Sequence, residues 1–258
     1  MIDGKRVLII MPAWNESEGV ADVIKEVYAT LPGVDIVVVD DGSGDETAKV
    51  AQGAGATVMK LPYNLGVGGA MRAGYKFAHD RGYDIAIQVD ADGQHDPRNV
   101  PELIARLDAG ADLVMGARFA GTGEYEARGP RRWAMLVLAF WLSKMARTKL
   151  TDVTSGFRAC GPDLIDAFAR WYPVEYLGDT VESTIAVVRA GYKVEQVPVA
   201  MRARTTGTPS QSPWKATMYL GRIGMILLLA FSRRSALGPA RKRSQQKSPE
   251  KSLEKQVS

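Results

Sequence analysis

The chain has 258 residues, of which 46% are hydrophobic and 24% charged, a composition that suits a globular protein with a sizeable core. Its single cysteine excludes an intrachain disulfide and fits a reducing compartment. From Arg233 to the C-terminus the net charge is +6, so the formal net charge of +4 leaves about −2 on residues 1 to 232. This distribution argues against a nucleic-acid-binding face spread over the domain.

The first 116 residues alternate between strand-like and helical patterns. Val/Ile-rich runs predict buried strands at 7–11, 36–39, 57–61, 84–89 and 113–115. Helical spacing predicts helices at 16–30, 45–53, 68–81 and 97–109. Apolar strands that alternate with helices predict an α/β fold, in which a mainly parallel sheet is covered by helices on both faces. The first apolar run is too short for a signal peptide, so none is expected.

Two short apolar segments mark the second half, Trp133 to Leu142 and Ile223 to Phe231. Each has about ten residues, against the roughly 20 that cross a bilayer, so neither is expected to span. Arg or Lys residues flank each segment, which favours a helix lying in the membrane interface for the second segment and leaves interface and burial in the core as equal alternatives for the first. The basic tail is expected to be disordered or to contact an anionic membrane surface. The expected division is a main α/β domain at 1–212, an interface helix at 213–237 and a tail at 238–258.

Polar side chains follow each of the first four predicted strands. In parallel sheets, ligands bind outside the carboxyl ends of the strands, so we expect these side chains to share one binding edge. They are Asn15 and Glu16, Asp40 and Asp41, Asn64, and Asp90 with Asp92.

The segment Asp90-Ala91-Asp92 places two carboxylates at the end of a buried strand. Mg²⁺ usually takes one or two protein carboxylates and completes its shell with substrate phosphates and water. A solvated turn is the alternative reading of this segment alone. The glycine-rich loop from Asn64 to Gly74 lacks the Lys-Ser/Thr ending of a P-loop, and the dinucleotide-binding fingerprint is absent after the first strand.

Arginines, the preferred residues for bidentate phosphate recognition, gather in the second half of the chain. A solvated surface is the alternative role for some of them. With His79 and His95 as the two histidines, a Ser-His-Asp set and a Cys/His zinc cluster are excluded. The arginines are Arg118, Arg128, Arg131, Arg132, Arg158, Arg202 and Arg204.

Taken in order, these motifs resemble family 2 glycosyltransferases of GT-A fold, and within them the dolichyl- or polyprenyl-phosphate mannose synthases. The resemblance spans roughly residues 5 to 232 and implies a Rossmann-like α/β fold. The matching segments are Pro12 to Glu16, Val39 to Ser43, Asn64 to Gly74, Gln88 to Pro97, Gly116 to Phe119, Thr154 to Arg158, and Val197 to Val199 followed by Arg202, Arg204 and Gly207.

The resemblance implies a role for each motif. Asp90, Asp92 and Gln94 would hold Mg²⁺ or Mn²⁺ on the donor diphosphate. Nucleoside contacts are expected from Pro12, Trp14, Glu16 and Asp41, with Asp40 beside them and Ala91 within the donor site. Phosphate contacts are expected from Arg118, Arg131 or Arg132, and Arg202 or Arg204. An acid near the acceptor is expected at Glu182, with Asp179 three residues before it.

In the resulting mechanism, the metal and the arginines stabilise the leaving nucleoside diphosphate while the acceptor attacks from the opposite face and inverts the anomeric centre. A lipid phosphate needs no general base, whereas a sugar hydroxyl would need one, with Asp179 or Glu182 as candidates. We therefore predict transfer from GDP-mannose or a UDP-sugar to polyprenyl or dolichyl phosphate. Transfer to a hydroxyl of a cell-envelope polysaccharide or glycolipid is the alternative.

The expected location is the inner face of the cell membrane, where a cytoplasmic, peripheral protein would be held by its short helices or by a membrane-protein partner.

Two departures from the synthases concern the acceptor: Asp179-Thr180-Val181-Glu182 is not their usual form, and Gly207 to Ser210 lacks one cation of their Gly-x-Ser-Lys. A nucleotidyltransferase would need a glycine-rich loop with Arg and Lys near residue 12. The segment Pro12 to Glu16 lacks it, so this class is disfavoured. A non-catalytic scaffold is disfavoured because both aspartates of the Asp-x-Asp pair are present.

Overall fold

The computed structural model describes residues 1–117, 130–174, 179–202, 237 and 240, without the side chains of 130–136. Within these ranges the chain forms a seven-stranded sheet in the order β3-β2-β1-β4-β6-β5-β7. The strands are β1 Val7–Ala13, β2 Asp35–Asp40, β3 Thr57–Lys60, β4 Ile85–Gln88, β5 Leu113–Ala117, β6 Arg158–Cys160 and β7 Val194–Pro198.

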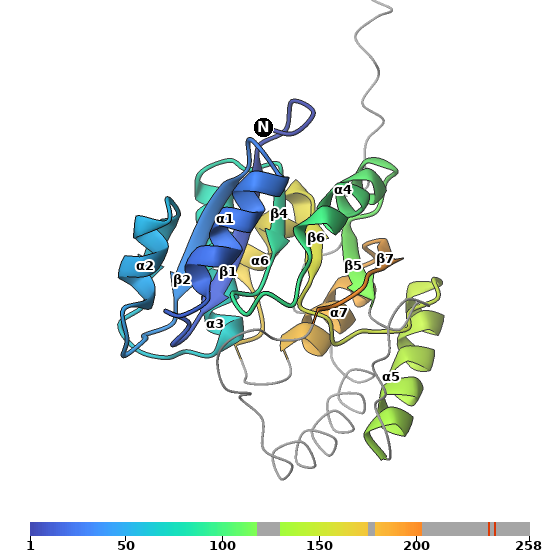
Figure 1. Cartoon of the computed structure of the whole chain (residues 1–258). Coiled ribbons are helices and arrows are strands. Elements are labelled where there is room, and N and C mark those ends of the chain that lie inside the picture. The colour runs from blue at the N-terminus through green and yellow to red at the C-terminus, as the bar shows by residue number, and fades with distance from the viewer. Residues whose placement is uncertain (118–129, 175–178, 203–236, 238–239, 241–258) are drawn as a thin grey trace, which may run out of the picture.

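Helices connect these strands and cover both faces of the sheet (Figure 1). All four helices predicted in the first half are present, although 97–109 is divided into a 3₁₀ turn, η1, and α4. The helices are α1 Val20–Thr30, α2 Thr47–Gly53, α3 Val67–Asp80, η1 Pro97–Asn99, α4 Val100–Asp108, α5 Pro130–Ala146, α6 Pro162–Arg170 and α7 Asp179–Arg189.

Strands β3, β2, β1 and β4 are parallel, and β5 is parallel to β7, as the prediction of a mainly parallel sheet requires. The exception is β6, which lies between β4 and β5 and is antiparallel to both. Strand β6 was not predicted from the sequence, because three residues that begin with an arginine carry no strand pattern. This strand brings the 154–158 segment beside the end of β4.

Two hydrophobic cores lie on opposite faces of the sheet, and β1 contributes to both because its side chains alternate. Leu8 and Ile10 belong to the core shared with α3, α5, α6 and α7. Ile9 and Met11 belong to the core shared with α1, α2 and α4. Burial on both faces explains why β1 and β2 are nearly continuous apolar runs, whereas β3, at the edge of the sheet, is exposed or half-buried.

Helix α1 begins four residues later than the predicted helix at 16–30. The backbone N–H groups of Glu16 and Ser17 instead donate to the Thr47 hydroxyl at 2.9 Å and to the Asp45 carboxylate at 3.2 Å. The loop after β1 is therefore bonded to the loop after β2 rather than wound into the helix.

Helix α5 contains the predicted apolar segment 133–142 and divides it between the interior and the solvent. Leu138 and Leu142 are buried, whereas Phe140 and Trp141 are exposed. The segment 223–231 lies outside the described residues. Among the helices that the structure describes, none combines the length and the hydropathy that crossing a membrane requires.

Gly68, in the first turn of α3, offers a test of packing. A Cβ at this position would lie 2.2 Å from the backbone oxygen of Pro173, whereas a Cβ at Gly53 would have no heavy atom within 4 Å. We expect Gly68→Ala to lower the free energy of unfolding by about 1–3 kcal/mol, the usual range for overpacking, although alanine normally favours a helix. Gly53→Ala should be neutral or stabilising. Urea denaturation of both variants measures the difference, and equal stability would contradict the close approach of α3 to 173–174.

Candidate active site

The polar side chains predicted to share one edge do so. Because β1, β2 and β4 are parallel and adjacent, the residues that follow them meet at the carboxyl edge of the sheet. Trp14 is exposed there, while Asp40 and Asp41 are buried. The backbone N–H of Asp41 donates to the Ala13 oxygen at 2.9 Å, so the chain ends of β1 and β2 remain paired up to this point.

The loops after β1 and β2 are joined by side-chain hydrogen bonds. The N–H of Asn15 donates to the Ser43 hydroxyl, and the N–H of Gly44 donates to the Asn15 side-chain oxygen, both at 2.9 Å. Burial alone would raise the pKa of Asp45, but hydrogen bonds from Thr47 and Ser17 lower it to about 2. Asp45 also accepts the backbone N–H of Thr47, the first residue of α2, whereas the hydroxyl of Ser43 accepts from the neighbouring loop.

Asp41 has a structural role that the sequence analysis did not predict. Its two carboxylate oxygens accept the N–H groups of Leu65 and Gly66 at 2.7 and 2.8 Å. Burial raises the pKa of Asp41, and Asp40 adds to that rise, against these two hydrogen bonds. Asp41 therefore fixes the glycine-rich loop that precedes α3, and its contact with a nucleoside stays a prediction.

Asp40 is fully buried beside it. One carboxylate oxygen accepts the Ser43 N–H at 2.9 Å, and the other has no hydrogen-bond partner among the described residues. A buried acceptor without a partner is costly, so this oxygen suits a donor group brought by a ligand.

Asp90 is held by two neighbours, Gln88 and His95. Its carboxylate accepts from the Gln88 amide at 2.9 Å, and its N–H donates to Nδ1 of His95 at 3.0 Å. Nδ1 is therefore the acceptor, and the neutral ring of His95 carries its proton on Nε2. The ring stacks on Phe157 with 5.0 Å between centroids. His95 thus orients the Asp90 backbone, a role that the sequence analysis missed although His95 lies within the quoted motif.

Gly156 allows the 154–158 segment, which leads into β6, to lie directly against Gln88 and Asp90. A Cβ at this position would be 2.8 Å from the Gln88 amide nitrogen and 3.2 Å from the Asp90 carboxylate. Glycine therefore lets β6 approach the carboxylate closely.

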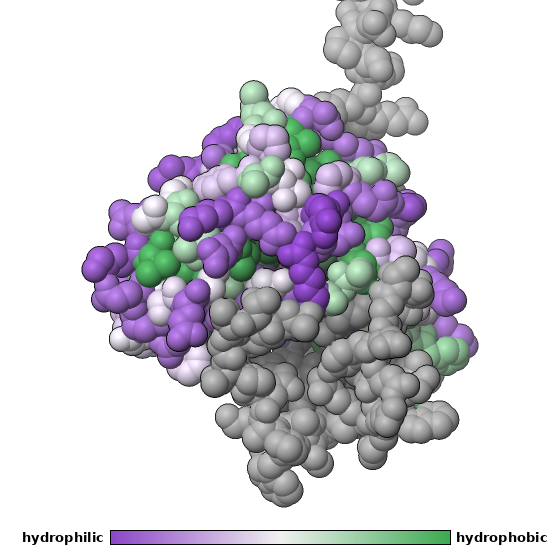
Figure 2. All heavy atoms as spheres, viewed as in Figure 1, coloured by the Kyte–Doolittle hydropathy of each residue, from purple (hydrophilic) through white to green (hydrophobic). Residues whose placement is uncertain are grey.

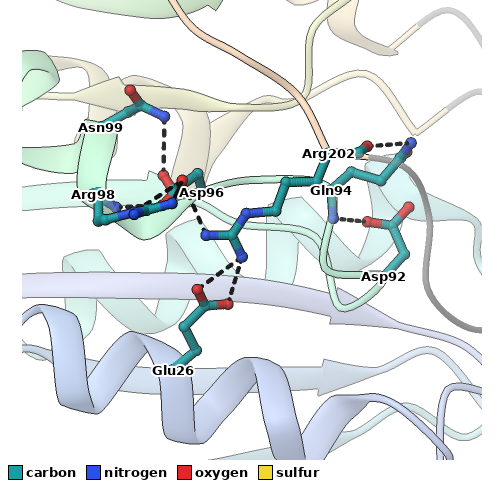
Figure 3. Close-up of polar contacts among 7 residues, drawn as sticks. All are labelled: Glu26, Asp92, Gln94, Asp96, Arg98, Asn99 and Arg202. Atoms are coloured by element: carbon teal, nitrogen blue, oxygen red, sulfur yellow. Dashed lines mark hydrogen bonds and ion pairs between the residues drawn. The ribbon is translucent and has the colours of Figure 1, made fainter.

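The carboxylates of Asp90 and Asp92 come from one turn, and Asp92 accepts the Gln94 N–H at 3.1 Å. In the described part of the chain, no three His, Cys, Asp or Glu side chains converge as a metal cluster. Two carboxylates suit an ion that takes its remaining ligands from phosphates and water. The side-chain amide of Gln94 donates over a long 3.5 Å to the Arg202 oxygen, so its expected role as a metal ligand stays a prediction (Figure 3).

Asp179, the first residue of α7, lies close enough to Asp90 for the two carboxylates to interact. Burial raises its pKa to about 6, against the attraction of Arg158, and the charge of Asp90 contributes to the rise. One of its carboxylate oxygens has no hydrogen-bond partner among the described residues. Glu182, one turn further along α7, is half-buried, and burial raises its pKa too.

Two arginines of the second half are engaged with protein groups. Arg158, which is in the arginine-rich second half but was not assigned a phosphate contact, is fully buried and donates to the Ser183 hydroxyl at 2.9 Å and to the Ser155 oxygen at 2.8 Å. It joins β6 to the start of α7 and compensates the charge of Asp179. Arg202 is paired with Glu26 and Asp96, so of the alternatives Arg202 and Arg204 the structure disfavours the first.

The other predicted phosphate ligands lie outside what the structure describes. The segments 118–129 and 203–236 hold Arg118, Arg128 and Arg204, and the side chains of Arg131 and Arg132 in α5 are likewise not described.

A mainly parallel sheet with helices on both faces and an Asp-x-Asp pair at the end of its central strand is the architecture of GT-A glycosyltransferases. The pattern of glycosyl transferase family 2 matches residues 8–165. The chain therefore belongs to glycosyltransferase family 2.

Relatives resemble this chain along most of its length. Polyprenol monophosphomannose synthase of Mycolicibacterium smegmatis is 30% identical over 81% of this chain and 82% of that protein. Undecaprenyl-phosphate mannosyltransferase of Micrococcus luteus is 31% identical over 80% of this chain and 88% of that protein. Among solved structures, glucosyl-3-phosphoglycerate synthase of Mycobacterium tuberculosis, in complex with Mn²⁺, UDP and phosphoglyceric acid, shares the fold. Its TM-score is 0.66 at 22% identity, over 88% of this chain and 78% of that one.

The raised pKa of Asp179 makes stability depend on pH. Below the unfolded pKa of about 4 the carboxyl is neutral in both states. As the pH rises from there through the folded pKa of about 6, the unfolded state releases the proton first, so stability is lost across this window. We expect Asp179→Asn to be more stable than the parent by about 1–3 kcal/mol at pH 7.5 and equal to it near pH 4. Asp22→Asn, at an exposed position of α1, should change stability by less than about 0.5 kcal/mol at both pH values. Urea denaturation measures this, and a pH-independent effect at Asp179 would refute the burial argument.

Proposed function

We propose that this chain is an inverting glycosyltransferase that moves a hexose from a nucleotide sugar to the phosphate of a polyprenyl phosphate. The observation that carries the proposal is the similarity to two relatives over about four-fifths of the chain, both named for mannose and a polyprenyl-type phosphate. The carboxylate pair and the buried acid beside it supply a matching site. GDP-mannose is the first donor to test, followed by UDP-sugars.

The proposed site binds the donor through its own fixed side chains. Asp90 and Asp92 would hold Mg²⁺ or Mn²⁺, which supplies positive charge next to the departing diphosphate. The nucleoside would be contacted by the free oxygen of Asp40 and by the loop that Asp41 fixes, both beside the ends of β1 and β2. Because Gln88 bonds the carboxylate of Asp90 and His95 bonds its backbone, the carboxylate does not have to reorganise when the donor binds.

A lipid phosphate attacks as an anion, so this reaction leaves Asp179 without a proton to remove. Its position beside Asp90 supports a second candidate acceptor, a hydroxyl of a cell-envelope glycan or glycolipid. A carboxyl with a pKa near 6 is a stronger base than an ordinary aspartate and is still ionised at neutral pH. We place this reaction second because both relatives above are named for the lipid phosphate.

The exposed face of α5 supports peripheral binding to the cytoplasmic face of a membrane. Val137, Phe140 and Trp141 are 49%, 55% and 44% exposed, and Lys144 lies 5.0 Å above the Phe140 ring. These four residues share one side of the helix, where apolar rings and a lysine suit the boundary between acyl chains and headgroups. The face over α1, by contrast, is mainly hydrophilic (Figure 2).

Transfer of radiolabelled sugar into organic-extractable lipid tests the proposed reaction. With polyprenyl phosphate and a panel of GDP-mannose, UDP-glucose, UDP-GlcNAc and UDP-galactose, we expect one donor to label the lipid in a manner that EDTA abolishes. Asp92→Ala should lower the rate at least about 100-fold, because the charge on the leaving group is no longer neutralised. Asp22→Ala serves as the matched control. Donor turnover without label in the lipid would move the assignment to a hydroxyl acceptor.

Cosedimentation with anionic vesicles tests the membrane face. Replacing both Phe140 and Trp141 by serine should weaken binding at least about tenfold, since each ring contributes about 1.5–3 kcal/mol when fully buried in an apolar phase. Val174→Ser, another exposed apolar position, should leave binding unchanged. Equal binding of both variants would show that α5 does not contact the lipid.

A further inference from the structure

Arg202 joins two parts of the molecule that are distant in sequence. Its guanidinium donates to both oxygens of Glu26 in α1, at 2.7 and 2.8 Å, and lies 2.9 Å from the carboxylate of Asp96 (Figure 3). Asp96 ends the turn that carries Asp92. One cation thus links α1 to the turn on which the carboxylate pair stands.

The backbone of the same residue reaches the turn a second time. The Arg202 N–H donates to the Gln94 oxygen at 3.1 Å, and the Gln94 N–H donates to the Asp92 carboxylate at 3.1 Å. Two successive hydrogen bonds therefore connect Arg202 to one of the proposed metal ligands. The guanidinium and the backbone together hold the turn at Gln94 and at Asp96.

These contacts differ from those of an ordinary surface ion pair. The side chains of Arg202, Glu26 and Asp96 are 33%, 36% and 13% exposed, so water screens the cluster only in part. One terminal nitrogen of the guanidinium donates to both oxygens of Glu26 and the other lies against Asp96, so the planar group serves two carboxylates at once, whereas lysine has a single ammonium. Glu26 contributes first, and Asp96 next, to a raised pKa of Arg202.

Arg98 provides a natural comparison within the same turn. It pairs with the same carboxylate of Asp96 at 2.6 Å, but its side chain is 72% exposed. It lies two residues from Asp96 and has no hydrogen bond to Glu26 or Gln94 among the described contacts. Arg98 therefore neutralises Asp96 locally, whereas Arg202 connects the turn to the rest of the fold.

We infer that Arg202 is a positioning residue that fixes the 92–96 turn against α1 and thereby sets the place of the Asp92 carboxylate. If the guanidinium turned towards a substrate phosphate, it would leave Glu26 and the largely buried Asp96, which lowers its value as a phosphate ligand. The part of the inference that concerns metal affinity rests on the proposed function. The part that concerns the turn does not.

Hydrogen exchange of the metal-free protein tests the turn directly. In Arg202→Gln we expect the backbone amides of residues 94 and 202 to exchange at least about five times faster than in the parent, because the link to α1 is lost. Glu26→Gln removes the same pair from the other side and should give the same change, so the test stands even if one variant folds poorly. Arg98→Gln should exchange as the parent does. Unchanged exchange in both the Arg202 and the Glu26 variants would overturn the inference.

Mn²⁺ affinity, measured from the electron paramagnetic resonance of the free ion in the presence of GDP or UDP, tests the consequence. We expect about tenfold weaker binding in Arg202→Gln, the lower end of the range for residues that orient metal ligands, and partial recovery in Arg202→Lys. The double variant with Glu26→Gln should be no worse than the single one, since both changes break one pair. A raised KM for polyprenyl phosphate with unchanged Mn²⁺ affinity would instead make Arg202 an acceptor ligand. Absence of transfer by the parent protein would refute the proposed function and leave the exchange result standing.

Discussion

The structure depends on keeping several carboxylates close together at one edge of a parallel sheet. Asp40, Asp41 and Asp179 are buried there, and Asp90 lies close enough to Asp179 to raise its pKa. Like charges in a site of low polarity repel one another, so each needs a compensating group. Backbone N–H groups serve Asp40 and Asp41, an amide serves Asp90, and the buried guanidinium of Arg158 lies beside Asp179.

The negative charge of these carboxylates is only partly compensated, and this remaining charge suits the edge to binding a cation. Oxygens of Asp40 and Asp179 have no hydrogen-bond partner within the described residues. An acidic edge with fixed carboxylates attracts a divalent cation, and a cation in turn holds a diphosphate. The repulsion that the fold tolerates is therefore the property that a metal-dependent glycosyltransferase needs before its donor arrives.

The arginines divide into two groups with different tasks. Arg158 and Arg202 hold parts of the site together, the first between β6 and α7 and the second between α1 and the 92–96 turn. Both depend on the planar guanidinium, which can serve two partners at once. Phosphate recognition by Arg118, Arg131 or Arg132, and Arg204 stays a prediction, because these side chains lie outside the described residues.

The sequence by itself determined the α/β class, the five strands and four helices of the first half and the shared polar edge. Those features follow from local patterns, such as the Val/Ile runs and the polar residues after them. Only the tertiary structure showed that β6 lies antiparallel beside β4, that Asp41 anchors the glycine-rich loop, and that His95 orients Asp90. Likewise, only packing decided that Arg158 and Arg202 pair with protein groups, because an arginine reads the same in a sequence whether its partner is a phosphate or a carboxylate 176 residues away.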